Sequence, residues 1–326
     1  MTSPLQNTKQ IYTYGNYLKN KFGCKVYKVG INISGFTCPN IDGTVAKGGC
    51  TFCENDSFSA STNEIKDLKG FHLNLDSTHN PFLEKQLEQL EVQFDAISKK
   101  QADEYNAEKF LVYFQSFTNT YAPFETLKAL YDKALSFENV VGLSIGTRSD
   151  SITDETLEYL AKLNKEKEIW IEFGIQSVYD ETLDKINRGH SSDNVKEWIL
   201  KSKDIGLHVC GHLIFGLPDE TKEMMIETSK AAYSWGIDSV KYHPLYVVKR
   251  TALGNDFVKG DFTPINEEDY LDVLVKSIEL KPENISVQRV TAGIDDDSLL
   301  SPDWCRDKNQ QIKNINKALK PLGFKY

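Results

Sequence analysis

The feature that most constrains the fold is a repeated alternation between short apolar runs and longer helix-like segments. The apolar runs are rich in β-branched and aromatic residues, and the segments between them carry helix-start signals, such as Thr153 with Glu155 and Thr156 close behind. Strands that alternate with helices indicate βαβ units and a parallel sheet. The predicted strands span residues 26–33, 110–116, 140–146, 169–175, 208–216 and 238–245. This order fits a partial (β/α) barrel or a doubly wound sheet, and the alternation alone leaves both open.

The alternation weakens after residue 250. Residues 1–25 are predicted as an N-terminal segment, residues 26–250 as the barrel and residues 251–326 as a C-terminal α/β extension. The extension is expected to hold a helix over 266–280, a short strand over 284–292 and an amphipathic helix over 309–323. Whether the extension covers the mouth of the barrel stays open.

Composition places the chain among globular enzymes. Its 326 residues are 40% hydrophobic and 26% charged, which argues against disorder. No apolar run approaches a transmembrane helix, and the first residues lack the apolar core of a signal peptide. We therefore expect a cytoplasmic protein with no membrane partner and with reduced cysteines. The net charge of −9 disfavours a passive nucleic-acid coat protein, and the lysines of 19–28 and 313–325 are more simply explained as solvated faces.

Three of the six cysteines fall in one loop directly after the first predicted strand. Cys38, Cys50 and Cys53 follow a C-x11-C-x2-C spacing. Parallel α/β folds place their chemistry at the carboxyl ends of strands, where this loop lies. A structural zinc site needs four closed ligands, whereas an iron–sulfur cubane held by three thiolates keeps one iron open to another ligand. The spacing alone leaves zinc, iron–sulfur and three unrelated thiols open.

The cysteine loop and the blocks after it resemble the radical S-adenosylmethionine (SAM) superfamily. Phe52 supplies the aromatic residue before the last cysteine, although the x11 spacing departs from the commonest x3 form. The loop GFTCPNIDGTVAKGGCTFC is similar instead to the YtqA/YhcC-type subgroup. The likeness extends over YFQSFTNTYAP, SIGTRSD, GHLIFGLPDET, KYHPLYVVKRTAL and SPDWC. The block IEFGIQSVYDETLDKINRGH is also similar to the radical SAM half of the elongator catalytic subunit, and the barrel blocks resemble, less closely, the oxygen-independent coproporphyrinogen dehydrogenase group.

The resemblance implies a fold, two cofactors and an electron donor. The fold would be a partial (β/α)6 TIM-like barrel with a C-terminal α/β extension. Cys38, Cys50 and Cys53 would bind a [4Fe–4S] cluster, whose fourth iron would take the amino and carboxylate groups of SAM. An electron from flavodoxin or ferredoxin would allow SAM cleavage, and the resulting 5′-deoxyadenosyl radical would abstract hydrogen from an unactivated C–H bond.

Residues at the ends of the later strands match SAM contacts in related enzymes. Ser116 and Phe117 would meet the SAM amino group through their backbone, and Thr118 through its side chain. Arg148 would bind the SAM carboxylate or an RNA phosphate, with a surface ion pair as its simpler explanation. The full set that the resemblance implies for SAM is Phe52, Ser116, Phe117, Thr118, Arg148, Gln176, Arg188, His212 and Leu217. His212 is equally typical of a core histidine with satisfied hydrogen bonds.

Three further residues are candidates for the substrate side. Lys241 and His243 alternate along the last predicted strand, so their side chains share one face. The thiol of Cys305 could give a hydrogen atom to a substrate radical, although buried packing is a simpler explanation for it. Glu172 would need a partner if it faces the barrel interior.

The resemblance favours a role in modifying the wobble uridine of tRNA. The substrate would be a 5-carboxymethylaminomethyl-type uridine and the product would lead toward the 5-aminomethyl form. One alternative is a radical oxidoreductase that acts on porphyrinogen or another small molecule. Another is a zinc-stabilised binding module, which would be colourless and would not cleave SAM.

Overall fold

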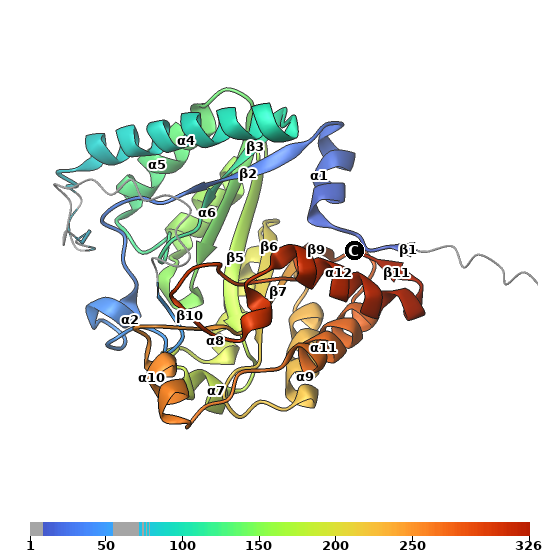
Figure 1. Cartoon of the computed structure of the whole chain (residues 1–326). Coiled ribbons are helices and arrows are strands. Elements are labelled where there is room, and N and C mark those ends of the chain that lie inside the picture. Colours follow the sequence, from blue (N-terminus) through green and yellow to red (C-terminus); the bar gives the residue numbers. More distant parts are fainter. Residues whose placement is uncertain (1–8, 55–71, 74, 76, 78) are drawn as a thin grey trace, which may run out of the picture.

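A curled parallel sheet forms the centre of the computed structural model, which describes residues 9–54, 72, 73, 75, 77 and 79–326 (Figure 1). Its seven strands are parallel and lie in the order β2-β3-β4-β5-β6-β7-β9. Their bounds are β2 Val26–Ile31, β3 Lys109–Phe114, β4 Val140–Thr147, β5 Glu168–Gln176, β6 His208–Phe215, β7 Ser239–Pro244 and β9 Ser286–Arg289. Because this order never reverses, the sheet is not doubly wound, and the predicted partial barrel is confirmed.

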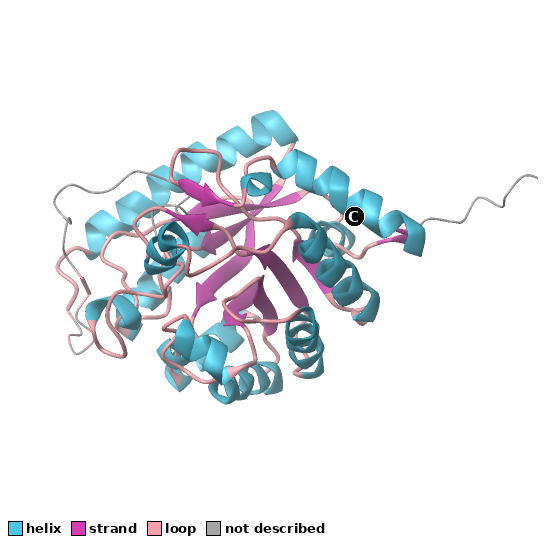
Figure 2. Ribbon diagram, turned by 60° about the horizontal axis from the view of Figure 1, so that its bottom comes forward, coloured by secondary structure: helices cyan, strands magenta, loops and turns pink. Residues whose placement is uncertain are grey.

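Helices cover the outer face of the sheet (Figure 2). They include α4 Leu83–Tyr105, α5 Phe124–Ser136, α6 Asp154–Leu163, α8 Ser192–Asp204, α9 Lys222–Ser234 and α11 Glu267–Leu280. The start of α6 follows the sequence signal, because Thr153 Oγ1 accepts a hydrogen bond from the backbone N–H of Thr156 at 3.2 Å. Outward strand residues such as Val112, Ile145 and Phe173 are fully buried in the main core. Each such side chain contributes roughly 1.5–3 kcal/mol by leaving water.

The helix α1 (Tyr14–Phe22) closes the amino-terminal end of the barrel. It contacts both β2 and β9, the two edge strands of the sheet. Tyr14 and Leu18 pack against Trp170 from inside the barrel, with the rings of Tyr14 and Trp170 4.9 Å apart and at 85°. This apolar floor leaves the opposite end, where the strands terminate, as the open end of the barrel.

The C-terminal part of the chain adds to the sheet and to the rim of the barrel. The strand β9 pairs with β7 and lies within the residues expected to form a short strand of the extension. The remaining elements are β8 Val247–Val248, α10 Ala252–Lys259, β10 Leu299–Ser301 and α12 Lys308–Leu319, and the pair β1 Lys9–Gln10 and β11 Phe324–Lys325 joins the two ends of the described chain. The sheet therefore continues past residue 250, and the three predicted segment boundaries remain predictions. Among the described residues, no helix has the length and apolar character to cross a bilayer.

Candidate active site

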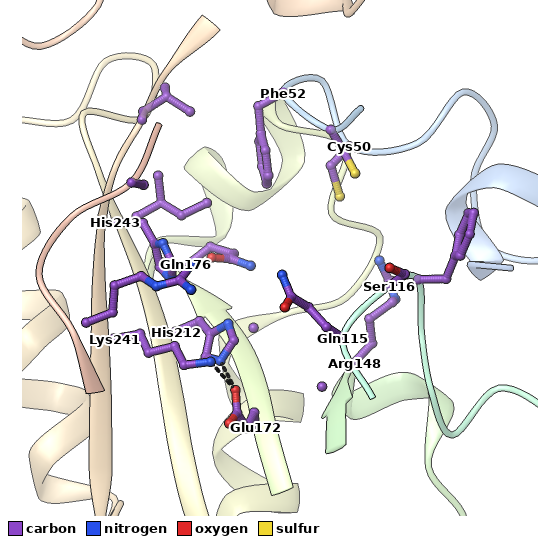
Figure 3. A pocket seen from close by; sticks show the side chains of 18 of the residues that line it. Cys50, Phe52, Gln115, Ser116, Arg148, Glu172, Gln176, His212, Lys241 and His243 are labelled. Carbon is purple, nitrogen blue, oxygen red and sulfur yellow. Dashed lines mark hydrogen bonds and ion pairs between the residues drawn. The ribbon is translucent and has the colours of Figure 1, made fainter. Parts of the chain in front are cut away.

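A cavity of about 500 Å³ opens at the carboxyl ends of the strands, where the cysteine loop meets the barrel (Figure 3). Most of the residues singled out from the sequence line it. They are Cys38, Cys50, Phe52, Cys53, Ser116, Phe117, Thr118, Arg148, Gln176, Arg188, His212, Lys241 and His243. Residues that lie far apart in the sequence therefore meet in one cavity.

Two of the predicted site residues lie outside this lining. Leu217 is buried and packs in an apolar cluster with Ile214 and Leu245, which Phe52 adjoins. Cys305 is fully buried, and its carbonyl oxygen lies 1.8 Å from the place that a Cβ on Gly293 would occupy. The roles of Leu217 as a SAM contact and of Cys305 as a hydrogen donor therefore remain predictions.

The cysteine loop is anchored on the segment that follows α7 (Asp180–Lys185). The buried side chain of Asn40 donates a hydrogen bond from Nδ2 to the backbone carbonyl of Arg188 at 2.9 Å. In return, Asn187 Nδ2 donates to the backbone carbonyl of Gly49 at 2.7 Å. The sequence analysis missed both asparagines, whose only signal is that each lies beside a predicted site residue or within the cysteine loop. These bonds hold the loop against the barrel.

Two buried guanidinium groups lie beside the thiols. Arg188 Nη1 is 3.7 Å from Cys50 Sγ, and Arg148 Nη2 donates to the backbone carbonyl of Arg188 at 2.8 Å. Burial, followed by the nearby sulfurs of Cys50 and Cys38, raises the pKa of Cys53 to about 12. A thiolate at this position therefore needs a cation at the sulfur. Arg148 is itself paired with Asp150, so the positive charge beside the thiols is that of Arg188. Three thiols beside a fixed guanidinium suit a metal cluster with several thiolate ligands.

Several polar atoms of the lining are buried without a hydrogen-bond partner in the described structure. They are Ser116 Oγ, Arg148 Nη1, Gln176 Oε1, Arg188 Nε and His243 Nε2. An unpaired buried polar group costs about 1–3 kcal/mol, so five such atoms around one cavity indicate a polar ligand. Gln176 and Phe117 also adopt positive φ angles of 64° and 60°, a strained backbone that is typical of ligand sites. The lining thus fits SAM, whose ammonium, carboxylate and adenine need both donors and acceptors.

Beneath the cavity, the carboxylate of Glu172 is the centre of a buried polar network (Figure 3). It forms ion pairs with Lys28 from β2 and Lys241 from β7, and its Oε2 lies 2.7 Å from His212 Nε2. Burial opposes its charge, yet the charges of Lys241 and Lys28 hold the pKa of Glu172 well below its usual range. Burial, and next the charge of Lys241, lowers the pKa of His212 from 6.5 to about 4, so this imidazole is neutral at pH 7.

Lys28 also joins the two edges of the sheet. Its Nζ donates to Gln288 Oε1 on β9 at 2.6 Å, and it lies 4.6 Å from the centre of the Tyr113 ring. The sequence analysis raised Glu172 as a barrel charge in need of a partner but did not identify Lys28, Gln288 or Tyr113. Their only signal is a polar residue at an inward position of a predicted strand.

Comparison with sequence families identifies the two parts of the chain. A model described as the Radical SAM superfamily matches residues 43–232, and one described as the Radical_SAM C-terminal domain matches residues 237–321. The protein YtqA of Bacillus subtilis (strain 168) is 35% identical over 321 residues, which cover 98% of this chain and 93% of that protein. Protein YhcC of Escherichia coli (strain K12) is 31% identical and covers 98% of this chain and 95% of its own.

More distant relatives share the barrel. A tRNA uridine(34) acetyltransferase of Methanocaldococcus infernus is 30% identical over 157 residues, which cover 47% of this chain and 29% of that protein. The solved structure of Methanocaldococcus infernus Elp3 with an N-terminal deletion superposes with a TM-score of 0.62 at 19% identity, and covers 91% of this chain and 63% of that one. The predicted likeness to YtqA, YhcC and the elongator subunit is confirmed, and iron–sulfur is favoured over zinc. The chain belongs to the radical SAM superfamily, whose cofactors are a [4Fe–4S] cluster and SAM.

Proposed function

We propose that this protein is a radical SAM enzyme that modifies the wobble uridine of tRNA. The observation that supports this proposal most is the similarity of almost half of the chain to a tRNA uridine(34) acetyltransferase. The proposed substrate is a 5-carboxymethylaminomethyl-type uridine, and the proposed product leads toward the 5-aminomethyl form. Flavodoxin or ferredoxin is the proposed electron donor.

In this proposal, residues on one side of the cavity bind the cluster and SAM, and residues on the other side face the substrate. Cys38, Cys50 and Cys53 hold the cluster, Arg188 lies beside the Cys50 sulfur, and Arg148, which is paired with Asp150, donates to the backbone carbonyl of Arg188. The end of β3 with Ser116 to Thr118, and the end of β5 with Gln176, receive SAM. When bound, the cluster and SAM supply one-electron cleavage of SAM and hydrogen abstraction from a C–H bond. Lys241 and His243 line the substrate side and help to exclude water.

The test combines cofactor analysis with a tRNA assay. The protein is purified without oxygen, its iron and sulfide are measured, and SAM cleavage is followed with dithionite, with and without tRNA that carries the 5-carboxymethylaminomethyl group. We expect four irons per chain, 5′-deoxyadenosine, and 5-aminomethyl nucleosides in the tRNA, as detected by mass spectrometry. The carboxymethyl group should leave as glyoxylate, because SAM serves as the two-electron oxidant and water hydrolyses the resulting imine. Absence of any change in the tRNA, despite SAM cleavage, would overturn the tRNA assignment and leave a small-molecule substrate.

The variant Cys53→Ala tests the ligand set. We expect it to lose most of its iron and to release no 5′-deoxyadenosine above background, because one iron loses its thiolate. Cys24→Ala is a matched control, because Cys24 lies before β2 and does not line the cavity. Full iron content and SAM cleavage in Cys53→Ala would show that the ligand assignment is wrong.

A further inference from the structure

The cavity lining carries far more positive than negative charge. Its cationic side chains are Arg148, Arg188, Lys241, Arg289 and Lys308, whereas Glu172 is the carboxylate among its described residues. This excess contrasts with the net charge of −9 of the whole chain. Arg188 lies beside the Cys50 thiol and Arg148 forms an ion pair with Asp150. The partners of Lys241, Arg289 and Lys308 remain to be explained.

Glu172 does not neutralise all of those remaining cations. Its carboxylate already forms ion pairs with Lys28 and Lys241 and accepts a hydrogen bond from the hydroxyl of Ser144. His212 Nε2 lies 2.7 Å from its Oε2. Lys241 in addition donates to the hydroxyl of Tyr113 at 3.0 Å. Among the cations of the lining, Arg289 and Lys308 therefore have no carboxylate beside them in the described residues, and both are accessible to a ligand in the cavity.

Arg289 and Lys308 converge on the same wall from two elements. Arg289 ends β9 and pairs in register with Lys241 of β7, and Lys308 begins α12. Neither forms an ion pair or a side-chain hydrogen bond within the described part of the chain. Both side chains line the cavity although they are exposed to solvent, and partial burial, and next the positive charge of Arg289, lowers the pKa of Lys308.

His243 adds an unpaired polar atom to this wall. Its Nε2 is buried without a hydrogen-bond partner, and burial followed by the charge of Arg289 lowers its pKa well below the usual range. The imidazole is therefore neutral at pH 7 and has one N–H to donate. In Figure 3, His243 and Lys241 lie across the cavity from Cys50. Two unpaired cations and a neutral donor suit a planar anion, such as a carboxylate.

We propose that Arg289, Lys308 and His243 form a subsite for a carboxylate group of the substrate, on the side of the cavity away from the cysteine loop. The identity of that group as the carboxymethylaminomethyl carboxylate rests on the proposed function. The subsite would hold the carboxylate, so that the C–H bonds of the methylene between the nitrogen and the carboxylate lie toward SAM. Arg289 and Lys308 are thus positioning residues.

The test compares two nucleosides that differ by a single carboxylate. Binding of 5-carboxymethylaminomethyluridine and 5-methylaminomethyluridine to the anaerobic, cluster-loaded protein with SAM is measured by titration calorimetry. We expect the wild type to bind the carboxylate form roughly tenfold more tightly, as charged hydrogen bonds allow. Arg289→Gln and Lys308→Gln should each remove most of this preference, and Arg289→Lys should restore part of it. Lys313→Gln is the matched control, because Lys313 is exposed on the same α12 and does not line the cavity.

The results distinguish failure of the carboxylate subsite from failure of the proposed function. A preference that survives in Arg289→Gln and Lys308→Gln, or that is missing from the wild type, overturns the subsite. Iron content shows whether a variant is folded, and Lys308→Gln, on an exposed helix start, keeps the test decisive if Arg289→Gln does not fold. If both variants weaken binding of tRNA with and without the carboxylate equally, the pair binds phosphate and the proposal fails. If the nucleoside preference holds but tRNA is never modified, only the proposed function fails.

Discussion

Glu172 is fully buried and yet ionised, because Lys28 and Lys241 lie against it inside the barrel. Such an arrangement is stable only while every partner is present, since a buried charge that loses its partner keeps its full desolvation cost. The same network keeps His212 neutral and leaves its proton uptake coupled to folding. Single substitutions in this network should therefore have large effects on stability.

Glu172→Gln should lower the free energy of unfolding by about 3 kcal/mol or more, because it leaves two lysines without their carboxylate. Urea unfolding followed by circular dichroism measures this change. The matched control is Glu104→Gln, which removes an exposed carboxylate 3.9 Å from Lys100 and should cost less than about 1 kcal/mol. Similar losses in the two variants would contradict a central role for Glu172.

His212 gives a prediction about pH. Its pKa is lowered from 6.5 to about 4 in the folded chain, so between these values the unfolded chain binds a proton that the folded chain does not. Stability therefore falls as pH decreases through this window, by roughly 3 kcal/mol from this group. His212→Asn should show a shallower loss of the urea midpoint between pH 6.5 and 4. If the urea midpoints of wild type and variant fall in parallel with pH, the titration of His212 does not contribute to the pH dependence of stability.

At the scale of elements, the cysteine loop depends on its contact with the segment after α7. Gly189, in this segment, has a φ of +77°, and a Cβ there would lie 2.6 Å from Val45 Cγ1 and 2.9 Å from Asn40 Oδ1. Gly206 has a similar φ of +84° but nothing within 4 Å of such a Cβ. Substitution of either glycine strains the backbone, but only substitution of Gly189 also displaces the cysteine loop, so comparing the two distinguishes these effects.

Gly189→Ala should reduce the iron bound after reconstitution by at least about half and speed iron loss to a chelator. The added methyl would clash with Val45 and Asn40 and so displace the cysteine loop. Gly206→Ala should keep the iron of the wild type, although both variants cost about 1 kcal/mol in backbone strain. Iron assays on both proteins measure the difference. Equal iron content would show that the loop is held elsewhere.

Elements with a strong local signal were predictable, and contacts made by closure of the sheet were not. β3 is marked by the apolar run from Phe110 to Phe114 because both of its faces are buried, and the cysteine spacing marks its loop directly. By contrast, Lys28 and Gln288 look like ordinary surface residues in short segments. They become site residues only when curling of the sheet brings β2 close to β9, which no local pattern encodes. Arg289 and Lys308 were missed for the same reason.

At the scale of the whole molecule, an acidic chain encloses a cationic cavity. Net repulsion should restrict RNA to few phosphate contacts near the mouth. The lysine cluster 19–28 lies on α1 and β2, and α1 forms the floor at the opposite end of the barrel, so it should not contribute.

Affinity for tRNA should accordingly fall with salt, with a slope of log Kobs against log salt of roughly −1 to −3, since each neutralised phosphate contributes about −0.7 to −0.9. Filter binding over a range of potassium chloride concentrations measures this slope. Lys19→Gln should leave it unchanged, because Lys19 belongs to the floor. A flat salt profile would favour the small-molecule alternative.

The pairing of the chain ends has a consequence for biosynthesis. β1 pairs in parallel with β11, and the backbone N–H of Val287 donates to the carbonyl of Tyr12 at 2.9 Å. The backbone hydrogen bonds of Lys9 and Gln10 therefore cannot form before Phe324 and Lys325 have been synthesised. The contact of α1 with β9 can form only once residues 286–289 have been synthesised, so the floor of the barrel is completed late, although α1 can meet β2 earlier.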